Sequence, residues 1–195
     1  WRHPNLEPRF KMTAVTACAG VFEFFTGSNA PRFHIKPAEK RMRYWLMKSE
    51  PSEYSIDDLA RDGQSAWFGV RNYQARNFMR DDMKVGDLAL FYHSSCPEPG
   101  IAGVCKIATA AAPDATQFDK KNPHYDPKSK PENPLWVCVE VAFVKKFELI
   151  PLATLRSAAE LAEMRILQRG NRLSITPVSE AEWGYISKTL AKAVK

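Results

Sequence analysis

Residues 136–144 constrain the fold of this chain more than any other segment, because their side chains alternate with the period of a β-strand. One face would carry Trp136, Cys138, Glu140 and Ala142, and the other would carry Val137, Val139, Val141 and Phe143. Such alternation is typical of a strand that lies in a sheet and packs one side against a core. The chain must therefore build a β-sheet, and this segment is its clearest strand.

Shorter runs predict further strands and helices on either side. Strands are expected at residues 43–48, 88–93 and 101–108, and Gly103 inside the last one suggests a bulge or bend. A helix is expected at residues 56–61, capped by Ser55 and ended by Gly63. Further helices are expected at residues 73–80, with Phe78 and Met79 facing inward, from Ser157 onward, and after the capping box at residues 179–182.

This order of elements predicts a small α+β domain. Its sheet of about five to six strands would be strongly bent and barrel-like, flanked by short helices. Residues 113–134 contain five prolines and read as a long polar loop. Loops of that length are uncommon in compact domains unless they serve a function.

The first 41 residues differ from the rest, since apolar patches there are broken by prolines and glycine without a sustained period. We expect them to be an extension that is poorly ordered or not native to the domain, which would then occupy residues 42–195. The net charge of +6 is also uneven. Residues 1–41 hold seven basic and three acidic side chains, whereas residues 42–195 hold 21 and 19. Charge alone therefore says little about the partners of the domain.

Composition excludes several classes of protein. Hydrophobic residues make up 45% of the chain, which is enough for a core, and no apolar run approaches the ~18 residues that span a bilayer. The four cysteines show no CxxC pair and no histidine at a zinc-ligand spacing, so we expect no metal, no cofactor and reduced thiols. Reduced thiols favour an intracellular location, which we expect to be cytoplasmic in a bacterium and nuclear in a eukaryote.

Residues 67–77 are the strongest functional signal in the sequence. They combine aromatic rings with arginines and side-chain amides, which a core segment or a plain surface loop would not. Rings beside amides are suited to hold a planar ligand such as a nucleobase. Trp67 is expected to stack on that base, next to Gly69 and Val70. The alternative is that Trp67 belongs to the core.

Polar side chains of the same segment predict the remaining contacts. Asn72 and Gln74 can pair with a base edge, although capping of the following helix is an equal alternative for Asn72. Arg71 and Arg76 are expected to contact phosphates. For Arg80, pairing with the neighbouring Asp81 and Asp82 is an equal alternative to a phosphate contact.

Three other groups are expected to complete the pocket. Lys48, Ser49 and Glu50 leave the end of the first strand together, with a surface Lys48–Glu50 ion pair as the alternative. His93 and Ser94 end a buried strand. Tyr125 and Asp126 lie in the long loop, which we interpret as a flap over the pocket, with an ordinary surface loop as the alternative. The predicted base-binding residues are Lys48, Ser49, Glu50, Trp67, Gly69, Val70, Asn72, Gln74, His93, Ser94, Tyr125 and Asp126.

Several strings resemble those of one family, the EVE domain. They are Tyr44-Trp45-Leu46-Met47-Lys48-Ser49-Glu50-Pro51, residues 67–77, Gly86-Asp87 with Phe91-Tyr92-His93-Ser94, Gly100-Ile101-Ala102-Gly103, and Tyr125-Asp126-Pro127 followed by Trp136. They cover about residues 42–188. Long motifs that recur together are specific.

The resemblance implies a PUA-like fold and a pocket for a modified base without catalysis. The base would be a modified cytosine in DNA, such as 5-methyl- or 5-hydroxymethylcytosine, flipped out of the duplex. We expect a monomer without membrane contact, which could deliver a partner nuclease or modification enzyme. Two alternatives stay open: a small amidohydrolase that uses Lys48 with Glu50 or His93 with Asp126, and a reader of modified RNA.

Overall fold

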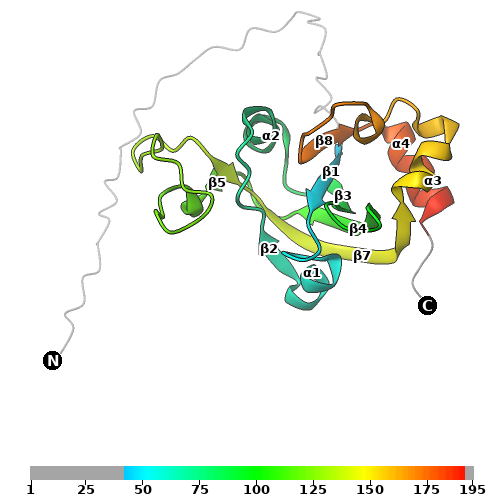
Figure 1. Ribbon diagram of the computed structural model, residues 1–195, viewed down its shortest axis with the longest axis horizontal. Coiled ribbons are helices and arrows are strands. Elements are labelled where there is room, and N and C mark those ends of the chain that lie inside the picture. The colour runs from blue at the N-terminus through cyan, green and yellow to red at the C-terminus, as the bar shows by residue number, and fades with distance from the viewer. Residues whose placement is uncertain (1–41, 192–195) are drawn as a thin grey trace, which may run out of the picture. The chain divides into compact units, whose positions relative to one another are not determined.

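A six-stranded mixed sheet forms the centre of the domain (Figure 1). The computed structural model describes residues 42–191. The prediction for residues 1–41 therefore lies outside the described residues. The order of strands across the sheet is β2-β7-β4-β3-β1-β8, and a separate two-stranded sheet pairs β5 with β6. The predicted α+β class and the number of strands are confirmed.

The strands have the following bounds. The main sheet contains β1 (Tyr44–Ser49), β2 (Gln64–Ala66), β3 (Leu88–His93), β4 (Gly100–Ile107), β7 (Glu140–Pro151) and β8 (Ile175–Val178). The small sheet contains β5 (Ala112–Pro113) and β6 (Val137–Cys138). Strands β1 and β3 run parallel, and every other pair is antiparallel.

Short helical segments connect the strands. The α-helices are α1 (Ile56–Asp62), α2 (Tyr73–Asn77), α3 (Leu152–Ser157) and α4 (Glu180–Tyr185). Wider π-helical turns, η1 (Phe78–Asp82) and η5 (Ile186–Leu190), continue α2 and α4. The 3₁₀ turns are η2 (Ala115–Gln117), η3 (Ala159–Leu161) and η4 (Arg165–Leu167). No helix of the described residues is long and apolar enough to cross a membrane.

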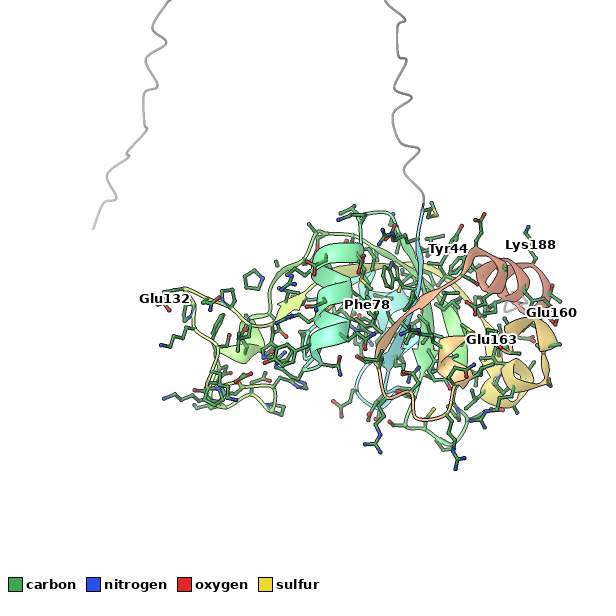
Figure 2. All side chains as sticks on the ribbon, turned by 90° about the horizontal axis from the view of Figure 1, so that it is seen from above. Tyr44, Phe78, Glu132, Glu160, Glu163 and Lys188 are labelled. Carbon is green, nitrogen blue, oxygen red and sulfur yellow. The ribbon has the colours of Figure 1, made fainter. Side chains whose placement is uncertain are left out.

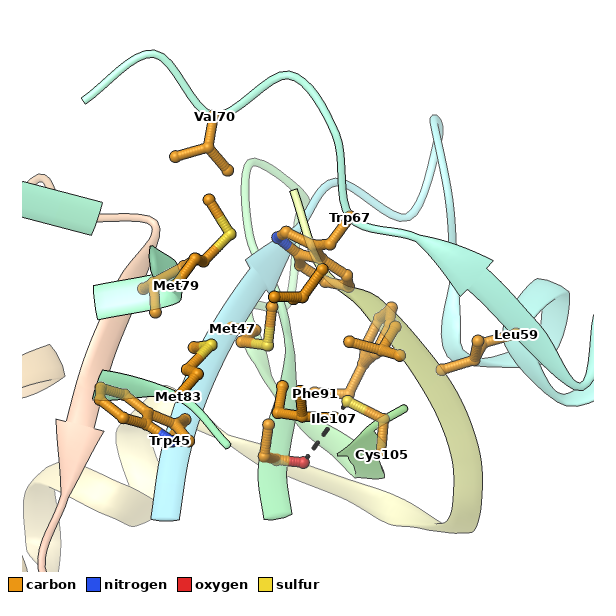
Figure 3. Packing of buried hydrophobic residues seen from close by; sticks show 14 of the residues in the cluster. Trp45, Met47, Leu59, Trp67, Val70, Met79, Met83, Phe91, Cys105 and Ile107 are labelled. Carbon is orange, nitrogen blue, oxygen red and sulfur yellow. Dashed lines mark hydrogen bonds between the residues drawn. The ribbon is translucent and has the colours of Figure 1, made fainter. Parts of the chain in front are cut away.

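The two faces of the sheet pack into two cores. One contains Trp45, Met47 and Phe91 with residues of α1 and the α2–η1 segment (Figure 3). The other contains Leu46, Leu90 and residues of α3, η3 and η5. Neighbouring residues of β1 alternate between these cores, as the pleat of a strand requires. Figure 2 shows Glu132 of the long loop at one end of the domain and Glu160 at the other.

The helix caps predicted from the sequence are confirmed. Ser55 accepts from the amide of Asp58, whose side chain accepts from Ser55 in return, and Gly63 ends α1 with a φ of 75°. Ser179 and Glu182 form the predicted capping box of α4. Each box pairs backbone N–H groups that a helix start leaves without partners.

Gly103 marks a close approach of three elements. A Cβ atom there would collide with the carbonyl oxygen of Lys145 on β7 and with the side chain of Ile56 on α1. The register of β4 against β7 shifts on either side of this position. The predicted bend is thus confirmed, and glycine is needed because the backbone of β7 occupies the space of a side chain.

The strand predicted at residues 136–144 is in fact two strands. Val137 and Cys138 pair with β5, the chain changes partners at Val139, and β7 then pairs with β2 and β4 as far as Pro151. Backbone pairing with β4 carries the strand through Lys145 and Lys146, where the side-chain period is lost. Only tertiary contacts could reveal this extension.

The helix expected from Ser157 was also wrong. Helix α3 ends at Ser157, whose hydroxyl donates to the carbonyl of Thr154. Ala158 then leaves the helical region, with φ −86° and ψ 114°. Strands β2 and β8 were missed, since three or four residues are too few to show a period. Helix α2 was placed correctly but continues as the wide turn η1, with Met79 buried and Phe78 against Trp45.

The described cysteines Cys96, Cys105 and Cys138 are free thiols. Cys105 is fully buried, and burial raises its pKa to about 12. Burial also raises the pKa of the Cys138 thiol. Because thiolates are the reactive form, both side chains behave as small apolar residues, as the sequence predicts.

The carboxylate of Asp87 organises the start of β3. It is 3% exposed and accepts hydrogen bonds from the Trp45 indole and from the amides of Arg43 and Lys84. We expect Asp87→Ala to lower the free energy of unfolding by roughly 2–3 kcal/mol, because the buried Trp45 indole and two part-buried backbone amides lose their acceptor. Urea unfolding measures this change. Glu132→Ala, at an exposed position, is the control and should stay within about 0.5 kcal/mol of the parent protein.

Candidate nucleic-acid interface

The parallel pairing of β1 with β3 brings two of the predicted groups together. Ser49 is directly opposite His93, and the amide and hydroxyl of Ser94 both donate to the carbonyl of Ser49. The carboxyl ends of both strands therefore meet at one edge of the sheet. We call Ser49, Trp67 and His93 the strand-end cluster, since Trp67 joins the other two through Phe91.

Phe91 is the hub of that cluster. Its ring is fully buried and meets Trp67 edge-on at 5.5 Å and His93 edge-on at 5.7 Å between ring centroids. Trp67 is only 9% exposed, and its backbone amide donates to Val139. The alternative that Trp67 packs in the core is thus what the structure shows, while its role in binding stays a prediction. Val70 lies in the same core.

Two ring nitrogens beside Phe91 remain available as donors. His93 Nε2 accepts from the amide of Ile56 at 3.1 Å, so the neutral ring carries its proton on Nδ1. Within residues 42–191, neither His93 Nδ1 nor Trp67 Nε1 has a protein partner, and every fully buried side-chain nitrogen there does. Both N–H groups are therefore accessible at the surface. Figure 3 shows the indole nitrogen of Trp67 pointing toward the carboxyl end of β1.

Lys48 and Glu50 contribute differently from the expectation. Strand alternation puts Lys48 on the opposite face of the sheet from Ser49, beside Tyr92. Burial lowers the pKa of Lys48, and its ammonium pairs with no carboxylate of the described residues. Glu50 instead accepts from the hydroxyl of Ser95 at 2.9 Å. The alternative of a Lys48–Glu50 ion pair was wrong.

A second cluster ties residues 69–76 to the long loop. Asp114 is fully buried and accepts from the amide of Gly69 at 2.9 Å and from Arg71 Nη1 at 2.8 Å. The hydroxyl and amide of Thr116 donate to its other oxygen. Burial raises the pKa of Asp114, but the hydrogen bonds from Arg71, Thr116 and Gly69 outweigh it and hold the pKa below its usual range. We call this arrangement the Asp114 clamp.

The guanidinium nitrogens of Arg71 all donate within the protein. Its Nε donates to the carbonyl of His124 at 2.7 Å, and its Nη2 donates to the Thr116 hydroxyl at 2.9 Å. Arg76 is similarly engaged, since it donates to Asn77 and to the carbonyl of Leu135. All three nitrogens of each guanidinium therefore have protein acceptors. The expectation that these two arginines hold phosphates gains no support from this geometry.

Gly69 is required by the clamp rather than by a ligand. Its φ is 79°, and a Cβ atom there would lie 2.7 Å from the His124 imidazole. An L-residue with a side chain would be strained in that conformation and would also displace His124. The group that approaches Gly69 is therefore a side chain of the long loop, 55 residues further along the chain.

The long loop is fixed by further hydrogen bonds. Gln117 is fully buried, and its amide bonds to both the N–H and the carbonyl of Trp136. Asp126 accepts from the Trp136 indole at 2.8 Å and from the amide of Lys128, so both of its oxygens are occupied. Asp126 is thus part of the loop framework. Tyr125 is half-buried beside it.

An aromatic stack lies on the outer side of this framework. Tyr73 stacks on Trp136 with ring centroids 4.9 Å apart, and Arg76 lies 4.8 Å from the Tyr73 ring centroid. Tyr73 is 56% exposed, and Gln74 is exposed as well. Asn72 caps α2 by accepting from the amides of Gln74 and Ala75, which confirms the capping alternative. Asn72 is itself exposed.

The predicted residues thus form two clusters and not one cage. The clusters are joined along the chain by Trp67 and Gly69. Asp114, Thr116, Gln117 and His124 were missed by sequence reasoning, although the Asp-x-Thr turn of residues 114–116 is a recognisable local signal. A cavity of about 540 Å³ lies elsewhere, at the amino end of β1, and none of the predicted residues lines it.

Comparison with known proteins defines the class. The EVE domain family model matches residues 43–189, so the chain belongs to the EVE domain family. Human thymocyte nuclear protein 1 is 47% identical over 163 residues, which span 73% of this chain and 72% of the relative. A Pseudomonas syringae protein of solved structure is 48% identical, covers 74% of this chain and 97% of its own, and superposes with a TM-score of 0.72.

One solved relative carries a ligand. The human THYN1 protein was crystallised in complex with DNA containing 5-methylcytosine. It is 47% identical to this chain, covers 74% of it and 95% of its own chain, and superposes with a TM-score of 0.70. The resemblance to the EVE domain inferred from the motifs is thereby confirmed.

The Asp114 clamp predicts a pH-dependent stability. Because its pKa is lowered in the folded state, Asp114 stabilises the protein above the unfolded pKa of about 3.9, and this contribution is lost as pH falls through the folded pKa. We expect Asp114→Asn to cost roughly 2–3 kcal/mol at pH 7. The cost should shrink toward pH 2. Urea unfolding of both proteins at several pH values measures it, and a constant difference would contradict the assignment.

His93 should remain neutral to lower pH than an ordinary histidine. Burial lowers its pKa, and protonation of Nε2 would break the bond from the Ile56 amide. Folding is therefore favoured above the unfolded pKa of about 6.5, and the contribution is lost as pH falls through the folded pKa. Nitrogen-15 NMR titration should show the Nδ1–H tautomer at pH 7 and a midpoint below 6.5. An Nε2–H tautomer would contradict this arrangement.

Proposed function

We propose that this protein is a non-catalytic module that binds DNA and recognises a modified cytosine, with 5-methylcytosine as the first candidate. The observation that carries the proposal is the human THYN1 protein, crystallised with 5-methylcytosine-containing DNA and 47% identical over most of this domain. Identity at that level over 95% of the solved chain supports a shared binding surface. The contacts to the modified base and the preference for 5-methylcytosine over other modifications belong to the proposal.

The strand-end cluster is the proposed base site. A flipped cytosine presents two acceptors on its Watson–Crick edge, and enzymes and readers recognise extruded bases through that edge. Trp67 Nε1–H and His93 Nδ1–H are donors on either side of Phe91 and lack protein acceptors within residues 42–191. We assign them to the base, with Ser49 and the exposed amides of Asn72 and Gln74 around it.

Three of the other predicted residues act as framework in this proposal. Gly69, Arg71 and Asp126 hold the loop beside the site, and Tyr73 offers an exposed ring to a neighbouring base or sugar. We propose a monomer in which the domain of residues 42–195 acts alone on DNA or delivers a partner enzyme. The name of the human relative supports a nuclear location in a eukaryote.

The arrangement of candidate catalytic groups supports a binding role over hydrolysis. A lysine–carboxylate mechanism needs the two groups within hydrogen-bond reach of a shared substrate atom. Lys48 forms no ion pair with a carboxylate of the described residues, and Glu50 is bonded to Ser95. Asp126 is bonded to Trp136. Hydrolysis of an acylated nucleoside that disappears in Lys48→Ala would favour the enzyme instead.

A binding series tests the proposal. Affinities are measured for matched duplexes and RNAs that carry cytosine, 5-methyl-, 5-hydroxymethyl- or 5-carboxylcytosine. We expect the 5-methylcytosine duplex to bind more tightly than the unmodified one. Trp67→Phe removes the indole N–H but keeps an aromatic ring, so it should weaken binding of the 5-methylcytosine duplex by roughly five- to tenfold, as one lost hydrogen bond predicts.

Trp183→Phe is the matched control, because Trp183 stacks on Tyr44 at the opposite end of β1 from the strand-end cluster. It should leave the affinity for the 5-methylcytosine duplex unchanged, and thermal unfolding verifies that both variants are folded. Equal affinity of the parent protein for modified and unmodified DNA would refute the proposal. Tighter binding of the modified RNA would replace it with the RNA-reader alternative.

A further inference from the structure

The segment between η4 and β8 carries an uncompensated positive charge. Between Glu163 and Glu180 the sequence contains three arginines, Arg165, Arg169 and Arg172, and no acidic residue. All three side chains are exposed. None of them forms an ion pair within residues 42–191. We call residues 165–174 the basic loop.

The basic loop has a defined conformation. The Asn171 amide nitrogen donates to the carbonyl of Arg165 at 2.7 Å, and its oxygen accepts from the amide of Leu173 at 3.1 Å. Gly170 takes a φ of 83°, which reverses the chain between Arg169 and Asn171. The side chain of Asn171 thus closes the loop from inside, while the arginines stay free for an external partner.

Strand pairing places the end of this loop beside the carboxyl end of β1. Ile175 of β8 is opposite Met47 of β1, and the carbonyl of Ser174 accepts from the amide of Lys48 at 2.8 Å. Arg172 is therefore two residues from the backbone that borders Ser49. Lys48 lies on the face of the sheet that carries Leu46, and Ser49 lies on the other face.

Another cation lies on the same side. Tyr92 pairs with Lys48 in register, and burial raises the pKa of its phenol, while the charge of the nearby Arg156 opposes that rise. Arg156 is exposed and, within residues 42–191, pairs with no carboxylate. Glu50, two residues after Lys48, accepts a hydrogen bond from Ser95.

We propose that the basic loop, through Arg169 and Arg172 with Lys48 beside them, binds the phosphate backbone that flanks the base in the strand-end cluster. The inference rests on the proposed function and reassigns the phosphate contacts expected of Arg71 and Arg76. Free guanidinium groups suit phosphates because they donate two parallel hydrogen bonds to them. Phosphate contacts add affinity and fix orientation, and they carry no base information.

The test compares two double variants that lose the same charge. Arg169→Gln/Arg172→Gln removes the proposed contacts. Lys84→Gln/Lys106→Gln is the control, because these exposed lysines lie at the amino end of β3 and the carboxyl end of β4, away from the strand-end cluster. Affinity for a 5-methylcytosine duplex and for its unmodified twin is measured over a range of salt concentrations, after thermal unfolding confirms that the variants are folded.

We expect the arginine variant to bind both duplexes more weakly by the same factor. The slope of log K against log salt should shrink by about 2, roughly one unit for each lost phosphate contact. The ratio between methylated and unmodified duplexes should stay constant, and the lysine variant should match the parent protein.

Two results would overturn the inference. One is a salt slope that stays the same or falls equally in the lysine control. The other is a lost methylation ratio with an unchanged slope, which would make the loop a reader of bases. The proposed function fails separately, if the parent protein binds both duplexes equally. In that case the change of the salt slope in the arginine variant still tests whether the basic loop contacts phosphates.

Discussion

The parallel pairing of β1 with β3 is the constraint on which the rest of the domain depends. Strand β1 lies between β3 and β8, so its pairing fixes both neighbours at once. The pairing puts Ser49 opposite His93 and aligns the carboxyl ends of two buried strands. Through β8 it also brings the basic loop to the same edge. One backbone arrangement thereby sets the base site, the loop and the division of the core into two faces.

In the Asp114 clamp, hydrogen-bond donors of residues 67–77 bind an acceptor of the protein itself. Arg71, Gly69 and Thr116 converge on one buried carboxylate, which no sequence pattern links to residues 67–77. A buried carboxylate is costly unless several donors satisfy it, and here four hydrogen bonds do. Arg71, in the segment with the strongest functional signal, thus stabilises the fold of the long loop. The arginines of the basic loop are instead exposed and form no ion pair within residues 42–191.

Local signals predicted the local elements, and non-local pairing decided the others. Ser55, Gly63 and Ser179 marked helix ends correctly because their hydrogen bonds span only three or four residues. The division of residues 136–144 at Val139, the length of β7 and the existence of β2 and β8 depend on partners far away in the sequence. Likewise, the motifs identified the EVE domain, while only the contacts showed that Trp67 packs in the core and that Asp126 belongs to the loop framework.

The sequence by itself determined the class of the fold, the family and the segments that surround the site, because motifs and capping boxes are short-range features. The tertiary structure alone decided which side chains remain available to a ligand. Lys48 and Ser49 are neighbours in sequence, yet the strand pleat separates them to opposite faces. Arg71 and Arg172 carry the same charge, yet one meets a buried carboxylate and the other does not. Availability depends on what packs nearby, and packing partners are set by the fold.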